Sequence, residues 1–352
     1  MLFTTGRANG GSKPGTGRCP RGLAGIVRFL FWLLTLASVG SAQSSSPPPS
    51  APPPSTSEQA SDTASPDDES GGFVFKKEVE EVVLHAIVVD AQNHLITGLA
   101  RDSFKVYEDG KPQELTSFRK ERVPVALGIL IDNSGSMLPK RAKVNEAALQ
   151  LVDASQQEDR VFVINFGEDA FLDQDYTPDV GKLTAALQRV ETRGSTALYD
   201  AVLAGVDHLD RTSPLQKNVL LVVTDGRDNA SQATFQELLH KLQSKSGPVL
   251  YTIALEQNER RDDGHRQSLR TLSEQTGGTA FFPSSLDEIQ SIASAIAQDI
   301  RSQYVIGYRS SNAHTSGTYH SIQVRALAGS APLRVTTRTG YISGSAGSDG
   351  SH

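Results

Sequence analysis

Long apolar runs alternate with amphipathic segments through the middle of the chain. Four runs are almost continuously apolar, which is typical of strands that are covered on both faces. They are residues 125–131, 160–166, 217–223 and 248–254. Three other segments carry apolar residues at the spacing of one helix face, beginning at Val144, Leu198 and Leu286. Strands that alternate with helices predict an α/β fold over residues 123–301, with a mostly parallel sheet between two layers of helices.

The last of these helices carries a start signal. Ser285 and Glu288 precede its apolar positions at the spacing of a capping box, in which the two side chains satisfy backbone N–H groups of the first turn. We therefore expect the helix to begin at this serine.

The two regions that flank the α/β region carry shorter runs rich in β-branched residues. These flanks are residues 73–122 and 302–342, and turn residues such as Asp109-Gly110 separate their runs. Neither flank alone has enough strands for a stable two-layer fold. Together they supply about six strands, close to what a small sandwich needs. We therefore expect the flanks to pack as one discontinuous, β-sandwich-like domain.

The amino-terminal segment has the pattern of an export signal. Residues 1–42 hold five basic and no acidic residues, and an apolar run over 29–39 is followed by small residues up to Ala42. The run is short for a bilayer span, which takes about 20 residues. We expect a cleaved signal peptide, with an uncleaved membrane anchor as the alternative. Residues 43–72 hold seven of the 17 prolines and predict a disordered linker, and residues 343–352 predict a disordered tail.

Charge and cysteine content narrow the classes of partner and compartment. The chain has 34 basic and 40 acidic residues, a net charge of −6, and loss of residues 1–42 would leave a net charge of −11. Nucleic acid is therefore not an expected partner, and a membrane is expected only through an uncleaved anchor. The one cysteine, Cys19, lies in the export signal, so neither a disulfide framework nor a Cys-ligated zinc site is possible. We predict an exported protein of the periplasm, cell surface or extracellular space, and the sequence does not indicate its oligomeric state.

Oxygen-bearing side chains gather at one edge of the predicted sheet. Ligands bind at the carboxyl ends of the strands in such folds, and two of the most apolar strands run into Asp132 and Asp225. Ser134 and Ser136 follow the first aspartate, and Thr196 opens the second helix. An all-oxygen set with only two carboxylates suits Mg²⁺ or Mn²⁺ better than Ca²⁺. Taken singly, these residues also fit ordinary roles, as turn residues after a strand or, for Thr196, as a helix N-cap.

The same three motifs resemble a known site. Residues 132–137, 194–200 and 224–228 read DNSGSM, GSTALYD and TDGRD. They resemble the metal-ion-dependent adhesion site of von Willebrand factor type A (VWFA) domains, over residues 123–301. The flanks extend the resemblance, over residues 75–342, to the bacterial exported "VWFA-related" family first noted in acidobacteria.

The resemblance carries expectations about fold, ion and partner. It implies a Rossmann-like doubly wound sheet and one Mg²⁺ or Mn²⁺ per domain. Ser134, Ser136 and Thr196 would hold the ion, and Asp132 and Asp225 would act directly or through water. It also implies adhesion to a protein partner through an Asp or Glu of that partner, without catalysis.

The expected partner-binding face surrounds these residues. It is formed by Asn133, Met137, Leu138, Ser195 and Gly226. We expect Met137 and Leu138 to be exposed on the first loop, where they would add apolar contacts.

Two other classes of function stay open. A non-catalytic structural subunit of an envelope assembly would keep the ligand set without using it. A metal-dependent hydrolase would use Asp132 as a nucleophile, but such sites usually need a second acid two residues later, where Ser134 stands. The chain also has no G-x-S-x-G, H-E-x-x-H or Walker motif.

Overall fold

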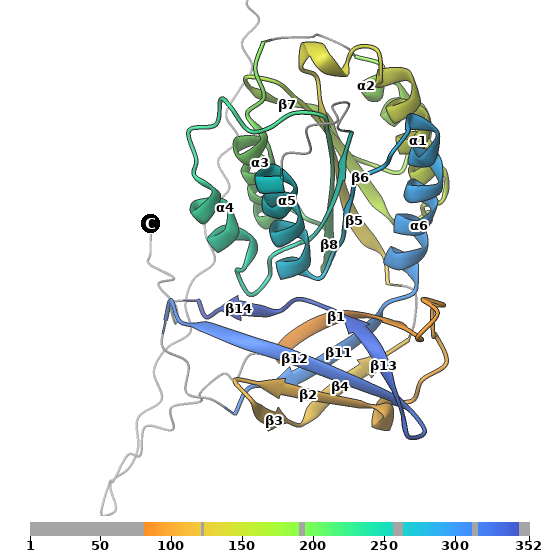
Figure 1. Cartoon of the computed structure of the whole chain (residues 1–352), viewed down its shortest axis with the longest axis vertical. Coiled ribbons are helices and arrows are strands. Elements are labelled where there is room, and N and C mark those ends of the chain that lie inside the picture. The colour runs from red at the N-terminus through yellow and green to blue at the C-terminus, as the bar shows by residue number, and fades with distance from the viewer. Residues whose placement is uncertain (1–80, 121–122, 190–193, 256–262, 312–315, 345–352) are drawn as a thin grey trace, which may run out of the picture. The chain divides into compact units, whose positions relative to one another are not determined.

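The computed structural model describes residues 81–120, 123–189, 194–255, 263–311 and 316–344. They form a six-stranded sheet covered by helices and an eight-stranded antiparallel sheet (Figure 1). The predicted signal peptide or anchor over 1–42 and the linker over 43–72 lie outside the described residues, as does most of the predicted tail. Across the described ranges, no helix is long and apolar enough to span a membrane.

The six-stranded sheet is built from the apolar runs of the middle region. Its order is β10-β9-β8-β5-β6-β7, and every neighbouring pair is parallel except β6 and β7. The strands are β5 (Val125–Asp132), β6 (Arg160–Phe166), β7 (Ala170–Thr177), β8 (Lys217–Thr224), β9 (Val249–Ala254) and β10 (Ala280–Phe281). Every residue of β5 and β9 is buried, as expected for strands that are covered on both faces.

Helices cover both faces of this sheet. One face packs against α1, α2 and α6, and the other against α3, α4 and α5 (Figure 1). The helices are α1 (Arg141–Asp153), α2 (Val180–Leu187), α3 (Leu198–Thr212), α4 (Phe235–Leu242), α5 (Asp263–Thr276) and α6 (Ile289–Arg301). Short 3-10 turns are η1 (Arg101–Ser103), η2 (Gly135–Met137) and η3 (Leu286–Glu288). The predicted α/β fold is confirmed, with one antiparallel strand, β7, at its edge.

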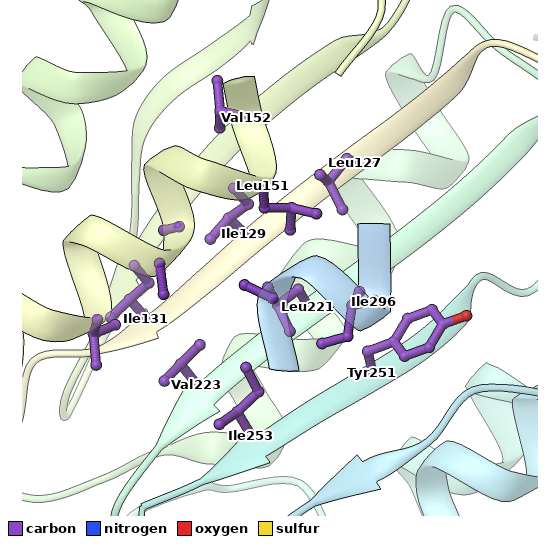
Figure 2. Packing of buried hydrophobic residues seen from close by; sticks show 14 of the residues in the cluster. Leu127, Ile129, Ile131, Leu151, Val152, Leu221, Val223, Tyr251, Ile253 and Ile296 are labelled. Atoms are coloured by element: carbon purple, nitrogen blue, oxygen red, sulfur yellow. The ribbon is translucent and has the colours of Figure 1, made fainter. Parts of the chain in front are cut away.

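Figure 2 shows the core on the face covered by α1 and α6. Its labelled residues are Leu127, Ile129 and Ile131 of β5, Leu221 and Val223 of β8, Tyr251 and Ile253 of β9, Leu151 and Val152 of α1, and Ile296 of α6. On the opposite face, a Cβ at Gly128 would lie 2.2 Å from the ring of Phe162. The glycine therefore lets this ring lie directly against β5.

The eight-stranded sheet takes its strands from both flanks of the chain. Its path is β3-β2-β12-β13-β1-β11-β4, with β14 paired to β12, and all neighbours are antiparallel. The strands are β1 (Glu81–Val89), β2 (Phe104–Glu108), β3 (Lys111–Gln113), β4 (Leu115–Arg119), β11 (Tyr304–Arg309), β12 (Tyr319–Ala328), β13 (Ala331–Thr336) and β14 (Gly340–Ile342). Side chains of β1, β2, β11 and β12 share one apolar core.

This sheet differs from the sandwich-like domain expected from the sequence. Hydrogen bonds join all eight strands into one antiparallel sheet, because β13 bridges β12 and β1. The strands of the two flanks interleave, so that β2 pairs with β12 and β1 with β11. The domain boundaries themselves, 73–122 with 302–342 around 123–301, stay a prediction.

The start of α6 also differs from its prediction. Ser285 is the N-cap of the 3-10 turn η3, which precedes α6, and its side chain makes no capping bond. Glu288 instead accepts a hydrogen bond from the backbone N–H of Ser284 at 3.1 Å. A complete capping box forms at α4, where Thr234 and Glu237 bond reciprocally. The spacing of a capping box in the sequence does not by itself show whether its two hydrogen bonds form.

Lys217 gives the stability of the α/β fold a dependence on pH. It begins β8, is only 3% exposed, and its Nζ donates a hydrogen bond to the carbonyl oxygen of Ile300 at 2.5 Å. Burial, helped by Arg301 and opposed by Asp159, lowers the pKa of Lys217 to about 7. The unfolded amine, with a pKa of about 10.4, binds more protons than the folded one between about pH 7 and 10. Stability therefore rises with pH in that window.

Through this group, the free energy of unfolding is expected to rise by about 2 kcal/mol from pH ~7 to pH ~9. Lys217→Met should remove this rise, which urea denaturation of both proteins across the window measures. Lys182→Met, at an exposed position of α2, is the matched control and should follow the wild type. Equal pH slopes in the wild type and Lys217→Met would contradict the prediction.

Candidate metal centre

The candidate site lies at the carboxyl edge of the six-stranded sheet. Strands β5 and β8 are parallel neighbours in register, with Ile131 opposite Val223. Asp132 ends β5, and Asp225 directly follows the end of β8. The topology therefore brings together two carboxylates that are distant in the sequence, where ligands of such sheets bind.

Asp132 is held rigidly beneath the site. It is fully buried, and its Oδ1 accepts a hydrogen bond from the backbone N–H of Ser134 at 2.7 Å. Its Oδ2 accepts one from the hydroxyl of Thr224 at 2.6 Å. Burial raises the pKa of Asp132, and these two hydrogen bonds oppose that rise. Each carboxylate oxygen thus has one fixed donor and keeps a second acceptor position.

The two serines connect the first loop to Asp225. The hydroxyl oxygens of Ser134 and Ser136 lie 3.2 Å apart, and the hydroxyl of Ser136 donates to Oδ1 of Asp225 at 2.7 Å. Ser134 is buried, whereas Ser136 is exposed on the turn η2. The two hydroxyls therefore extend from the buried side of the site to its exposed side.

Thr196 joins the same group from a third loop. A Cβ at Gly226 would lie 3.2 Å from its Oγ1, so Thr196 packs against the residue after Asp225. Its backbone is paired with Asn229, which bonds its N–H at 2.8 Å and its carbonyl oxygen at 3.0 Å. The N-cap of α3 is Ala197. Thr196 therefore precedes the cap position, which differs from the N-cap role considered for it.

Acidic side chains fix the loop after β8 to the start of α3. Asp228 accepts hydrogen bonds from the N–H of Tyr199 and the hydroxyl of Ser231. Asp200 accepts two more, from Gln232 and Ala233, at 2.8 and 3.0 Å. These bonds hold the loop after β8 against the start of α3, and they give Asp228 a structural role.

Two basic residues of the site were not predicted from the sequence. Lys140 is 2% exposed, and its Nζ contacts Oδ2 of Asp225 at 2.5 Å. Arg141 is 3% exposed and donates to Asn165 at 2.8 Å. Burial lowers the pKa of Arg141 to about 10, although the charge of Asp132 opposes this shift. The one available signal was the Lys-Arg pair itself, four residues after Ser136 and next to a predicted acidic site.

The donor set fits a small, hard cation. Two carboxylates and three hydroxyls meet at one edge of the sheet, and the set contains neither nitrogen nor sulfur. Oxygen ligands of this kind are preferred by Mg²⁺ and Mn²⁺. Such an ion would supply a positively charged binding point for an anionic group.

The family model for the von Willebrand factor type A domain matches residues 127–295. The chain contains a von Willebrand factor type A domain. Domains of this kind are often protein-interaction or adhesion modules, and they often bind a divalent metal. The finer resemblance of the flanks to one bacterial family stays a prediction.

Comparisons with individual proteins give distant likenesses. The uncharacterized protein sll0103 of Synechocystis sp. is 26% identical over 110 residues, which span 30% of this chain and 26% of that protein. The solved structure of BatB from Bacteroides thetaiotaomicron is 19% identical, with a TM-score of 0.41, and the match covers 50% of this chain and 97% of that one. A von Willebrand factor type A protein from Catenulispora acidiphila is 12% identical, with a TM-score of 0.44 and coverages of 70% and 76%.

The expected partner face of the von Willebrand factor type A domain is partly corrected. Leu138 is 57% exposed, as predicted, but Met137 is fully buried, which contradicts the prediction for it. Met137 ends the turn η2, which directs its side chain into the core under α1. Asn133 is buried at 6% exposure, and Ser195 and Gly226 are half-buried. Ser136 and Leu138 therefore present exposed side chains on the first loop.

A second group of potential ligands lies in the antiparallel sheet. Ligand atoms of Glu108, Asp109 and His320 lie within 4.8 Å of one another. His320 contacts Asp109 at 2.8 Å, and Glu108 accepts hydrogen bonds from the hydroxyls of Tyr308 and Ser310. These bonds account for the burial of the Glu108 carboxylate without an ion.

Proposed function

We propose that the von Willebrand factor type A domain of this chain binds a protein partner through Mg²⁺ or Mn²⁺. The ion would be held by Asp132, Ser134, Ser136, Thr196 and Asp225. The observation that carries the proposal is the hydrogen bond from Ser136 to Asp225 at 2.7 Å, with the Ser134 hydroxyl 3.2 Å from that of Ser136. These atoms come from separate loops, and their convergence is what an ion with oxygen ligands requires.

The partner is expected to present an Asp or Glu side chain. Mg²⁺ takes about six oxygen ligands, so five from this chain would leave a position open to the outside. Ser136 and Leu138 are exposed beside that position. A carboxylate would supply the missing oxygen, and Leu138 would add apolar contact area.

Binding rather than catalysis suits the surroundings of Asp132. Both of its oxygens accept hydrogen bonds, from Ser134 and Thr224, and these bonds keep the carboxylate in place as an orienting group. Ser134 also stands where an aspartyl nucleophile usually needs a second acid, two residues later. Export to the periplasm, the cell surface or the medium is part of the same proposal.

Metal binding is tested by melting curves with and without Mn²⁺ at ~10 mM. For a dissociation constant of about 1 mM, the ion would stabilise the wild type by about 1.4 kcal/mol. Ser136→Ala should abolish this shift, because the hydroxyl is lost from the ligand set while the buried residues stay in place. Ser291→Ala, at an exposed position of α6, is the control and should keep the shift. A wild type without any shift would contradict the proposed metal dependence.

A second candidate function follows from Lys140. Its ammonium group already neutralises Asp225, so the site has a paired carboxylate without an ion. A structural subunit of an envelope assembly would need nothing more. Capture of an unchanged set of partners by wild type and Ser136→Ala, with and without chelator, would favour this candidate.

A further inference from the structure

Lys140 carries a positive charge in direct contact with Asp225, a proposed ligand of the cation. It precedes α1 directly, and its side chain is 3% exposed. Its Nζ lies 2.5 Å from Oδ2 of Asp225 and 3.1 Å from the carbonyl oxygen of Leu255. Leu255 in turn donates its N–H to the carbonyl oxygen of Thr224 at 2.8 Å. The ammonium group is thus built into the junction of the first loop with the ends of β8 and β9.

The two oxygens of Asp225 have different partners. Oδ2 faces Lys140, and Oδ1 accepts the hydrogen bond from Ser136 at 2.7 Å. Only Oδ1 is therefore on the side of the serine hydroxyls. Lys140 restricts Asp225 to a single oxygen, directly or through water, and keeps it from the bidentate binding that Ca²⁺ often uses.

We propose that Lys140 sets the charge of the metal centre: it weakens the hold of the site on its cation and leaves the loaded site more positive toward an anionic partner. This inference rests on the proposed function. Lys140 adds one positive charge to the site whether or not an ion is bound. Without an ion, that charge balances Asp225, so an entering cation meets repulsion from a neighbouring ammonium group.

The same charge favours the partner once the ion is in place. A divalent ion bound by two carboxylates forms a group with no net charge. Such a group would attract an incoming carboxylate only weakly. With Lys140 present, the loaded site carries one more positive charge than it would with a neutral side chain at this position. The lysine thus shifts affinity from the ion alone toward the ion together with an anionic ligand.

The test measures Mn²⁺ affinity by isothermal titration calorimetry in the full chain, for wild type, Lys140→Met and Lys140→Gln. Both variants remove the charge, and the glutamine keeps an N–H donor for Asp225. Loss of the repulsion should lower the dissociation constant for Mn²⁺ about tenfold in both. Lys143→Met is the matched control, because Lys143 lies on α1, is 48% exposed and pairs with Asp287. Its dissociation constant should equal that of the wild type.

A purely structural role of Lys140 would give the opposite result, since loosening Asp225 would weaken Mn²⁺ binding. Binding in the wild type with equal or weaker binding in both variants therefore overturns the inference and leaves the proposed function standing. Binding in the variants but not in the wild type supports the inference and overturns the metal dependence of the wild type. Absence of binding in all four proteins overturns both.

The folding of the variants gives a further outcome. If Lys140→Met and Lys140→Gln fold only when Mn²⁺ is present, the ion replaces the charge of the lysine, which supports the inference. If neither variant folds with or without Mn²⁺, the ion does not take over from Lys140, and the inference is overturned.

Discussion

Asp225→Ala is expected to lower the free energy of unfolding by about 3–5 kcal/mol in addition to removing the metal site. The reason is the buried pair with Lys140, in which the two side chains are 1% and 3% exposed. Without Asp225, the ammonium group keeps the carbonyl oxygen of Leu255, at 3.1 Å, as its partner. Removing one member of a buried ion pair leaves the other charge uncompensated, which costs far more than a surface pair is worth.

Urea denaturation without added metal measures this loss. The double variant Asp225→Ala/Lys140→Met removes both charges and should recover part of the lost stability, because no unpaired charge stays buried. Ser136→Ala should lie within about 1 kcal/mol of the wild type, since it removes one hydrogen bond near the surface. If Asp225→Ala proved as stable as the wild type, the buried pair would not be formed in solution.

The consequence concerns the choice of variants for binding experiments. An aspartate at the tip of a strand is the obvious position for disrupting a metal site. Here, loss of partner capture in Asp225→Ala would combine loss of the ion with loss of the fold. Ser136→Ala separates the two effects, because its hydroxyl contacts Asp225 from the exposed side.

The central strands were predictable because each is covered on both faces. The apolar run at residues 217–223 corresponds to β8 (Lys217–Thr224), in which all but one residue is buried. Strand β7 (Ala170–Thr177) gave no such signal, because it lies at the sheet edge and, among the strands that the structure describes, pairs only with β6. Phe171 and Leu172 are exposed on it at 52% and 47%. A continuous apolar run indicates a strand that is buried on both faces. An edge strand is too exposed to show such a run.

The site was predictable only in its local parts. The spacing of Asp132, Ser134 and Ser136 is local, and each aspartate stands at the end of an apolar run. Lys140 pairs with Asp225 across 85 residues of sequence, and no local pattern reports such a pair. Met137 was expected outside, but the turn η2 points it into the core. Local motifs do not show how the chain folds between them, and that fold decides which distant residues meet.

The antiparallel sheet depends on one buried carboxylate that joins its two flanks. Glu108 ends β2 and is fully buried. Its Oε2 accepts hydrogen bonds from the hydroxyls of Tyr308 at 2.6 Å and Tyr341 at 3.2 Å, and its Oε1 accepts one from Ser310 at 2.5 Å. All three donors belong to the second flank, whereas Glu108 belongs to the first. The sheet therefore has a polar connection between the flanks inside its apolar core.

Glu108→Ala is expected to lower the stability of this sheet by about 3 kcal/mol or more. A buried donor that loses its acceptor costs about 1–3 kcal/mol, and three hydroxyls lose the same one. Glu108→Gln keeps an acceptor oxygen and should cost less, while Glu114→Ala, at an exposed position, is the control and should cost little. Hydrogen exchange at the amides of β12 measures the effect inside the sheet. Mn²⁺ affinity should stay unchanged in all three variants, because their positions are not in the metal centre. If β12 keeps its protection in Glu108→Ala while β2 loses it, the flanks do not unfold as one unit, and the discontinuous domain is wrong.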